Sequence, residues 1–373
     1  MDCSHSFGEN IHSLNVNAPL PRTTSEVHKL SEIEFRRRFA NQFNDPDFEK
    51  LNAEITKLSD TAWKNYNEGK KAPHTQKAGS EFKDPEYKLN VEWLKARSAI
   101  EQAQSLYENP ALPSTVLLIN GSDRNETTCP GEISKSSRLI NWARETLEDS
   151  GIEVKVLNLS EMTAEFGKMI YPCKGCVSTA MPLCHWPCSC YPHQSLGQVN
   201  DWMNDIYPLW VRAHGIMVVT PVYWHQAPST LKLMMDRLVC ADGGNEDPTS
   251  TQGKSAKLAK EIEMTGWDYP RHLSGRVFSV IVHGDVTGID SLKENLTAWL
   301  NEMELIPAGH KADLGRMIGY LEPYALNHEA LDQDKDLLLE VKNAAMNLGL
   351  AVMAKRSCKL ESFTPQLLDP RPK

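Results

Sequence analysis

The sequence has no uninterrupted apolar stretch that approaches the roughly 18 residues a membrane-spanning helix needs. Its first residues, MDCSHSFGENIHS, contain no apolar segment, so we expect no secretory signal. It also has no excess of positive charge, because 40 Lys and Arg stand against 49 Asp and Glu, giving a formal net charge of −9. A nucleic-acid-binding surface is therefore not favoured. Together these absences predict a cytoplasmic protein with neither membrane nor nucleic acid as a partner.

Two common phosphate-binding motifs are missing as well. No Gly-Lys-Ser/Thr closes a Walker A pattern, and no G-x-G-x-x-G follows a candidate strand. No Ser-His-Asp triad or paired-carboxylate constellation stands out either. The sequence therefore gives no support to catalysis by a side-chain nucleophile or by a pair of carboxylates.

The first third of the chain carries no recognisable catalytic pattern. Residues 1–30 are polar and without periodicity, and we expect them to be disordered. Residues 31–112 are predicted to form a helical extension, with SEIEFRRRFANQF and NVEWLKARSAIEQAQSLY as helices and NEGKKAPHTQKAGSEFKDPEY as a loop between them. We expect this extension to pack on the main domain or on a second subunit.

After NPALP at 109–113, short β-branched runs alternate with helical stretches. The predicted strands are 115–120, 153–159, 215–220 and 276–283, with a weaker one near Leu305, and the predicted helices are 135–149, 199–213, 228–239 and 290–303. This alternation predicts an α/β fold with a parallel sheet covered by helices on both faces. About five strands fit the flavodoxin-like doubly wound form, where ligands bind beyond the carboxyl ends of the strands. We assign this domain to residues 113–355, with a final helix from about 332 to 355 and a tail at 356–373.

Three loops follow predicted strands and should converge on one edge of the sheet: residues 121–137, 220–228 and 283–288. The first, GSDRNETTCPGEISKSS, leads into a helix N-terminus, whose free backbone N–H groups and partial positive charge suit a phosphate. Ser122, Ser134, Ser136 and Arg124 can add hydrogen bonds. Alternatively, Ser134 or Ser136 is a helix cap and Arg124 a surface residue. Without a glycine-rich pattern, a single phosphomonoester such as that of FMN fits better than a dinucleotide.

The segment TPVYWHQAPSTLKLMMDRLV at 220–239 adds a family resemblance. Together with Gly121-Ser122-Asp123-Arg124, the serine cluster and VHGDVTG, it resembles the NADPH-dependent FMN reductases, a flavodoxin-like family, over roughly residues 114–310. The resemblance implies that the FMN phosphate is held by Ser122, Arg124, Ser134, Lys135 and Ser136. It also implies that Pro221, Val222, Tyr223 and Trp224 line the flavin ring, and that His283, Gly284 and Asp285 border its other edge.

Several of these positions have alternatives. NETTCPGEI makes the first loop longer than in the family, so Thr127 or Thr128 could replace one of the hydroxyls. The aromatic rings of Tyr223 and Trp224 could instead pack in the core, and His283 is either a hydrogen-bonded core imidazole or a donor to the flavin edge. We expect Asp236 and Arg237 to form a structural pair that ties their helix to a neighbouring subunit or loop.

Five of the nine cysteines fall within CKGCVSTAMPLCHWPCSC. Two cysteines spaced C-x2-C are typical metal ligands, and iron–sulfur flavoproteins of the same superfamily bind a [4Fe–4S] cluster through four cysteines at this place. A cluster here would use Cys173, Cys176, Cys184 and Cys188, or Cys190 in place of the last. The alternatives are a zinc site that includes His185, and unligated thiols over the flavin, so no metal is favoured.

The resemblance implies an NAD(P)H-dependent FMN reductase-type oxidoreductase, in which the flavin itself performs the chemistry. NAD(P)H would reduce FMN, and a small acceptor such as a quinone, a nitro or azo compound or free flavin would take two electrons. The alternatives are an iron–sulfur flavoprotein that carries electrons to a protein partner, and an FMN-binding regulatory or scaffold protein. The resemblance also implies a homodimer or homotetramer with the flavin near a subunit interface.

Overall fold

The computed structural model describes residues 22–23, 29–125, 127–128, 133–309, 311–320 and 324–360. The chain divides into two compact units, one reaching to Leu94 and including Pro192–Val199, the other comprising Lys95–Tyr191 and the chain from Asn200 onward. The division falls inside helix α3 (Val91–Glu108) instead of at the predicted boundary of residue 113. The reason is that Ile100 and Ala103 of α3 belong to the core of the second unit.

The first unit contains helices and short strands. Its elements are β1 (Arg22–Thr23), α1 (Glu32–Ala40), η1 (Asn41–Phe43), η2 (Pro46–Leu51), α2 (Asn52–Asn67), β2 (Lys70–Ala72), β3 (Thr75–Lys77), β4 (Lys88–Asn90) and η6 (Gln194–Leu196). Strand β1 pairs antiparallel with β2, and β3 pairs with β4. The predicted loop between the helices therefore contains strands, each too short to show a period in the sequence. Most of residues 1–30, predicted to be disordered, and the tail from residue 361 lie outside the described residues.

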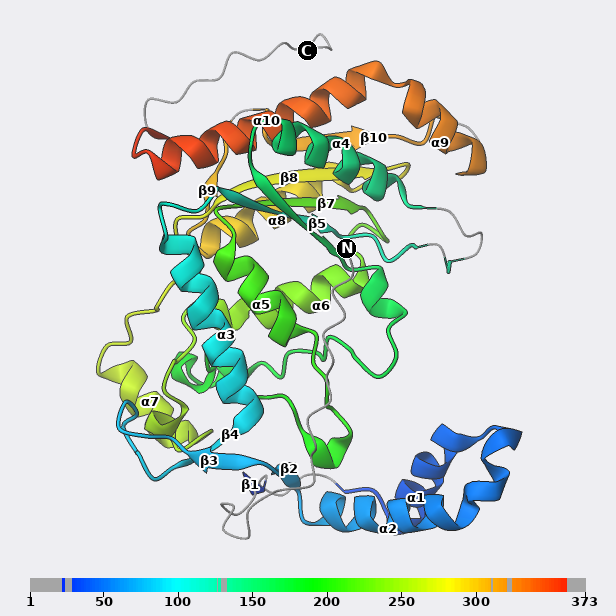
Figure 1. The fold of residues 1–373 in the computed structure, drawn as a ribbon, viewed down its shortest axis with the longest axis vertical. Coiled ribbons are helices and arrows are strands. Elements are labelled where there is room, and N and C mark those ends of the chain that lie inside the picture. The colour runs from blue at the N-terminus through cyan, green and yellow to red at the C-terminus, as the bar shows by residue number, and fades with distance from the viewer. Residues whose placement is uncertain are drawn as a thin grey trace. The chain divides into compact units, whose positions relative to one another are not determined.

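The second unit is built on a parallel sheet with the order β10-β8-β7-β5-β6, and β9 also pairs with β8 (Figure 1). Its strands are β5 (Thr115–Asn120), β6 (Glu153–Asn158), β7 (Gly215–Pro221), β8 (Val277–Gly284), β9 (Ile306–Pro307) and β10 (Leu314–Met317). Strand β5 is buried along its whole length, as its apolar sequence TVLLIN predicts. The flavodoxin-like doubly wound fold is confirmed. The fifth strand, predicted near Leu305, is split into β9 and β10, both beside β8.

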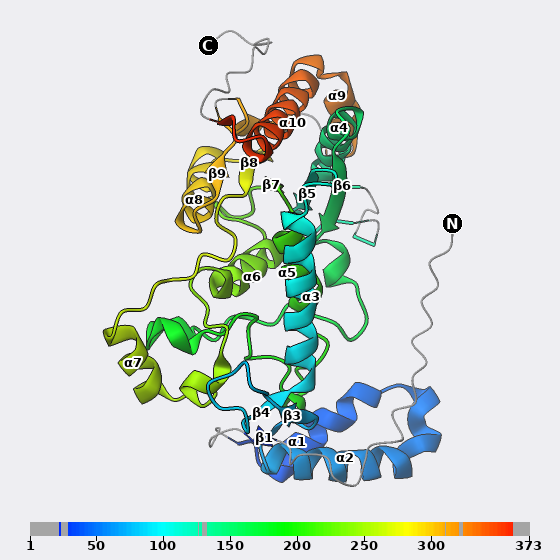
Figure 2. The ribbon, with the colours of Figure 1, turned by 60° about the vertical axis from the view of Figure 1, so that its left-hand side comes forward.

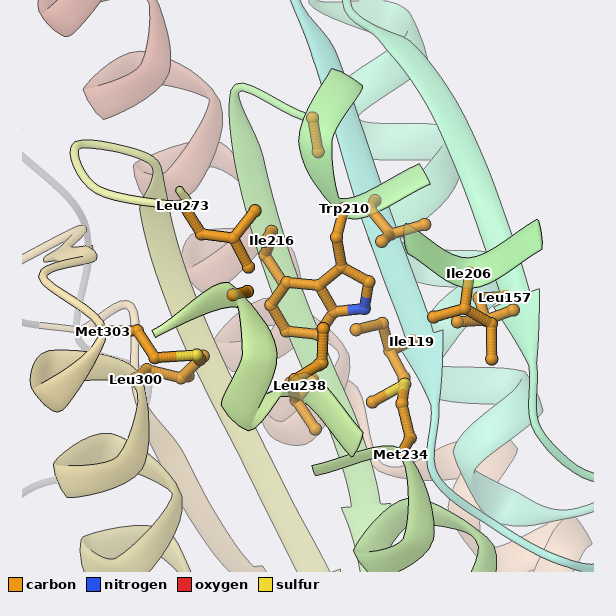
Figure 3. Packing of buried hydrophobic residues seen from close by; sticks show 14 of the residues in the cluster. Ile119, Leu157, Ile206, Trp210, Ile216, Met234, Leu238, Leu273, Leu300 and Met303 are labelled. Carbon is orange, nitrogen blue, oxygen red and sulfur yellow. The ribbon is translucent and has the colours of Figure 1, made fainter. Parts of the chain in front are cut away.

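Helices cover both faces of this sheet (Figures 1 and 2). On one face α4 (Lys135–Asp149) and α10 (Lys335–Arg356) pack against apolar residues of β5, β7 and β8. On the other face lie α5 (Met203–Arg212), α6 (Ser229–Arg237) and α8 (Ile289–Glu302). Trp210 of α5 is fully buried there, with Ile119, Ile216 and Leu238 around it (Figure 3).

The remaining helices are α7 (Ala256–Met264), α9 (Tyr324–Gln333) and the 3-10 helices η3 (Glu161–Thr163), η4 (Cys176–Ser178), η5 (Met181–Leu183), η7 (Leu238–Ala241) and η8 (Pro248–Thr251). Asp334, whose side chain accepts from the backbone N–H of Leu337, caps α10 and separates it from α9. Among the described residues α10 has the length and a mean hydropathy of 1.3 that would suit a membrane span, but 61% of that stretch is buried inside the protein. Helix α10 is therefore a core helix, and charged residues interrupt its apolar sequence.

Candidate functional site

A cavity of about 170 Å³ lies where β5, β7 and β8 end at the carboxyl edge of the sheet. It brings together every residue predicted to bind the cofactor except Trp224, namely Ser122, Arg124, Ser134, Lys135, Ser136, Pro221, Val222, Tyr223, His283, Gly284 and Asp285. These residues lie at the ends of three neighbouring parallel strands, either in the last residues of a strand, in the loop that follows it, or in the first turn of α4. The switch point of the doubly wound sheet therefore has the location expected for a ligand site. Whether each residue contacts a cofactor stays a prediction.

The first loop is organised by Asn120, a buried residue that the sequence analysis missed. Its amide oxygen accepts from the backbone N–H of Ser122 at 3.2 Å, and its amide nitrogen donates to the Ser137 hydroxyl at 2.9 Å. Gly121 lies so close to β7 that a Cβ atom there would stand 2.7 Å from Oγ1 of Thr220. A side chain amide ending an otherwise apolar strand is the signal that could have identified Asn120.

The serines at the start of α4 are already partly engaged within the protein. Ser134 is the N-cap of the helix and accepts from the backbone N–H of Ser137 at 3.2 Å, which is the capping alternative. The Ser136 hydroxyl lies 2.7 Å from Nε2 of His283. Between them, Lys135 is buried and its ammonium donates to the carbonyl of Ile318 at 3.1 Å. The pocket wall is therefore preorganised by hydrogen bonds that join β8 and α4.

His283 is a buried, hydrogen-bonded imidazole, as one of its two interpretations predicts, and it also lines the cavity, while its role as a donor to the flavin edge stays a prediction. Burial, reinforced by the nearby charge of Lys135, lowers the pKa of His283 to about 3. Burial likewise lowers the pKa of Lys135, although the Asp285 carboxylate partly opposes that effect. At neutral pH the imidazole is uncharged, so His283 contributes a hydrogen-bonding group and no positive charge to the pocket.

A tight turn follows β7 at Tyr223–Gln226, where the two end residues exchange backbone hydrogen bonds of 2.9 Å. The two central residues, Trp224 and His225, both have left-handed backbones with φ of 48° and 65°. That geometry is a type I′ turn, which normally holds Asn-Gly. Trp224 is 96% exposed, so the core-packing alternative is wrong for it, and its ring does not line the cavity. Tyr223 is 38% exposed and does line the cavity.

Thr127 and Thr128, considered as substitutes for one of the pocket hydroxyls, are used elsewhere. Both turn toward Asn125, whose side-chain oxygen accepts from the Thr127 hydroxyl at 2.6 Å. The backbone N–H of Asn125 donates to the Thr128 hydroxyl at 3.0 Å, and its side-chain amide donates to the carbonyl of Ser160 at 2.8 Å. Neither threonine lines the cavity. Asn125 therefore holds Thr127 and Thr128 by hydrogen bonds.

The pairing predicted for Asp236 and Arg237 is wrong. Asp236 pairs with Lys232 one turn back on the exposed face of α6. Arg237 is 1% exposed and pairs with Asp201, while also donating to the carbonyl of Tyr171 at 2.8 Å. Adjacent residues on a helix point in different directions, so the two charges serve separate partners. Arg237 thereby ties α6 to a distant loop of the same chain, and this part of the prediction is confirmed.

The cysteine-rich stretch gives no support to a metal centre among the residues that the structure describes, where no group of three or more candidate ligands could hold a metal ion. Cys184 is buried and packs in the main core, while the sulfur atoms of Cys176 and Cys190 are within hydrogen-bonding distance of each other. His185 lies 2.5 Å from the Ser189 hydroxyl and 3.1 Å from the Thr251 hydroxyl, through different ring nitrogens. With both nitrogens occupied, His185 does not fit the proposed zinc set.

The chemistry of the pocket fits the phosphate end of FMN. Hydroxyl groups, the guanidinium of Arg124, the ammonium of Lys135 and the N-terminus of α4 are all donors suited to a phosphate. A volume of about 170 Å³ is smaller than the roughly 300–1,000 Å³ of pockets that enclose a whole drug-sized ligand. The cavity would therefore enclose part of the cofactor, and the rest would lie at its open rim.

Comparisons with known proteins agree with this chemistry. The model of the family described as NADPH-dependent FMN reductase matches residues 114–312. No curated protein matches the chain in sequence.

Solved structures match at low identity. A flavone reductase is 16% identical with a TM-score of 0.37, and the alignment covers 64% of this chain and 63% of that one. RosB with a bound 8-demethyl-8-formylriboflavin-5'-phosphate intermediate is 15% identical with a TM-score of 0.45, covering 70% and 93%. An NAD(P)H:quinone oxidoreductase from Methanothermobacter marburgensis is 14% identical with a TM-score of 0.36, covering 64% and 96%. The chain thus spans less than two thirds of the flavone reductase.

Proposed function

The chain belongs to the NADPH-dependent FMN reductase family, and we propose that it is an FMN-dependent oxidoreductase that passes two electrons from NAD(P)H to a small acceptor. The observation that carries this proposal is that the phosphate-type donors between β5 and the first turn of α4 line one cavity together with residues from the ends of β7 and β8. Bound FMN would supply the chemistry of a two-electron transfer between the nicotinamide and the acceptor.

The residues of the pocket would hold and orient the cofactor. Arg124 and Lys135 bring positive charge, and the first turn of α4 adds the partial positive charge of a helix N-terminus. The Ser122 hydroxyl, on a buried residue, accepts from the backbone N–H of Arg124 at 3.2 Å and so keeps its own hydrogen to donate. The neutral imidazole of His283 fixes the Ser136 hydroxyl without adding charge.

The rim of the pocket suggests the class of acceptor. Tyr223 lines the cavity with a partly exposed ring, and Trp224, the next residue of the turn after β7, has an almost fully exposed ring. Exposed rings next to a site suit planar aromatic molecules, because offset stacking needs a flat partner. We therefore propose a quinone, a nitro or azo compound or a free flavin as acceptor.

The proposal is tested first by a visible spectrum of anaerobically purified protein before and after NADPH is added. Flavin absorption that bleaches with NADPH and returns when a quinone is added is the expected result. A flavin that NADPH does not reduce would favour a scaffold or carrier role. Protein that stays colourless after FMN is added would refute the assignment of the pocket.

A titration with FMN tests the phosphate assignment. Lys135→Gln should raise the Kd for FMN about 10- to 100-fold, because a hydrogen bond to a charged group contributes about 1.5–3 kcal/mol. Arg138→Gln is the matched control, since Arg138 lies on the same helix but pairs with Asp332 away from the cavity. Equal affinities for the two variants would contradict the role of Lys135. We also propose a homodimer or homotetramer, as the family resemblance implies. Sedimentation of the holoprotein measures the mass of the assembly, and a monomer mass would refute this proposal.

A further inference from the structure

Two thiols of the cysteine-rich stretch lie side by side although fourteen positions separate them. The sulfur atoms of Cys176 and Cys190 are 3.4 Å apart. Cys176 opens η4 directly after Gly175, whose left-handed backbone has φ of 63°. A disulfide has its sulfurs about 2.05 Å apart, so the pair is close to bonding distance. The described cysteines are all free thiols.

A lysine from a distant part of the chain binds both sulfurs. The ammonium of Lys254, which lies just before α7, donates to Sγ of Cys176 at 3.3 Å and reaches Sγ of Cys190 at 3.7 Å. It also donates to the carbonyl of Leu183 at 2.8 Å, which fixes its position. A cation beside a sulfur favours the thiolate, the form that acts as a nucleophile.

The two thiols differ in exposure. Cys176 is half-buried and open to small reagents, whereas Cys190 is 7% exposed and packs with Tyr171 and Tyr191. The hydrogen bond from Cys190, followed by the charge of Lys254, lowers the pKa of Cys176 to about 6. An accessible thiolate beside a buried second thiol is the arrangement of an attacking and a resolving cysteine.

The neighbouring cysteines lack this arrangement. Burial raises the pKa of the thiols of Cys184 and Cys240 above the usual range. For Cys188 the contact with Cys190 and then burial raise the pKa of the thiol. These three thiols are therefore held in the protonated form at neutral pH, in contrast to the thiol of Cys176.

We propose that Cys176 and Cys190 form a redox-active dithiol that reduces low-molecular-weight disulfides by thiol–disulfide exchange. The Cys176 thiolate attacks one sulfur of R–S–S–R, the R–S⁻ that leaves takes a proton from water, and a mixed disulfide remains. The Cys190 thiol then gives its proton to water, and its sulfur attacks Sγ of Cys176 and expels the second R–S⁻. The two cysteines are oxidised to one disulfide while the substrate is reduced to two thiols, and neither flavin nor NADPH is consumed.

The first experiment treats the reduced full-length protein with glutathione disulfide and follows free thiols and peptide mass. Wild type should lose two more thiols per chain than Cys176→Ser, in which Cys358 stays exposed as well, and should gain a link between Cys176 and Cys190, located after cleavage at Leu183. Cys190→Ser should instead trap one glutathione on position 176, and Cys176→Ser should lose the reaction. Cys188→Ser is the matched control and should behave as wild type. A link elsewhere, or iron or zinc bound stoichiometrically by these thiols, would overturn the proposal.

The second experiment measures the alkylation rate of Cys176 by iodoacetamide against pH. In wild type the alkylation rate should reach half of its maximum near pH 6. In Lys254→Gln this pH should be higher by at least one pH unit, because the cation beside the sulfur is lost. Lys254→Arg should restore most of the shift, and Lys257→Gln, which alters an exposed lysine three residues away, should change nothing. An unchanged midpoint in Lys254→Gln, with thermal unfolding like that of wild type, would refute the role of the lysine.

Discussion

The turn after β7 should be strained, and relieving that strain should stabilise the protein while impairing its activity. Trp224 and His225 occupy left-handed backbones, each of which costs about 1–2 kcal/mol in a residue other than glycine. We consider the double variant Trp224→Asn with His225→Gly, the pair that a type I′ turn prefers. Since Trp224 is 96% exposed, its removal sacrifices little buried surface.

The expected gain is the strain released minus the entropy that glycine adds to the unfolded chain, about 0.5–1 kcal/mol. A net stabilisation of about 1–2 kcal/mol follows, which corresponds to a rise in Tm of roughly 1–3 °C in a chain of 373 residues. Calorimetry of the FMN-free protein measures the Tm. Turnover of a quinone with NADPH should fall in the double variant, because the exposed indole that follows Tyr223 is lost.

Two further variants separate the effects. His225→Gly alone should raise the Tm and keep quinone turnover. Phe166→Asn removes an equally exposed ring, 99% accessible, from a site outside the turn and should change neither quantity. A double variant whose Tm is unchanged or lower would refute the strain, and one with full turnover would refute the role of Trp224.

Three other perturbations test two residues of the site and the buried ion pair of Arg237 with Asp201. Gly121→Ala should destabilise the protein by about 1–3 kcal/mol and weaken FMN binding, because a Cβ would overlap the Thr220 side chain. Denaturant unfolding measures the stability, and an FMN titration measures the affinity. In the folded protein the pKa of His283 is about 3, whereas a histidine in the unfolded chain binds a proton near pH 6.5. The free energy of unfolding of wild type should therefore fall as the pH drops below about 6.5. Between pH 7 and 5 this fall should be about 2 kcal/mol smaller in His283→Asn, because the variant lacks the imidazole. Asp201→Asn should destabilise by about 3–5 kcal/mol, since it leaves the buried guanidinium of Arg237 without its counter-charge, and equal urea midpoints would contradict this.

Much of the second unit could be predicted from the sequence because its signals are local. The apolar run TVLLIN gives β5 its bounds, and Ser134 as a cap begins α4 at Lys135, so both elements have the predicted limits. The loops that follow the strands converge because parallel strands end at the same edge of a sheet. That rule brought Ser122, Pro221 and His283 into one predicted set, and the same residues line one cavity.

The tertiary structure decided what depends on partners far away in the chain. Arg237 pairs with Asp201 and not with its neighbour, and the outward turn of Trp224 follows from hydrogen bonds between Tyr223 and Gln226. Lys254 meets Cys176 across 78 positions, which no spacing motif encodes. Local patterns fix the elements because they act through adjacent hydrogen bonds and side-chain periodicity. The partner of a buried charge or a thiol is fixed only when packing brings separate segments together and removes the competing water.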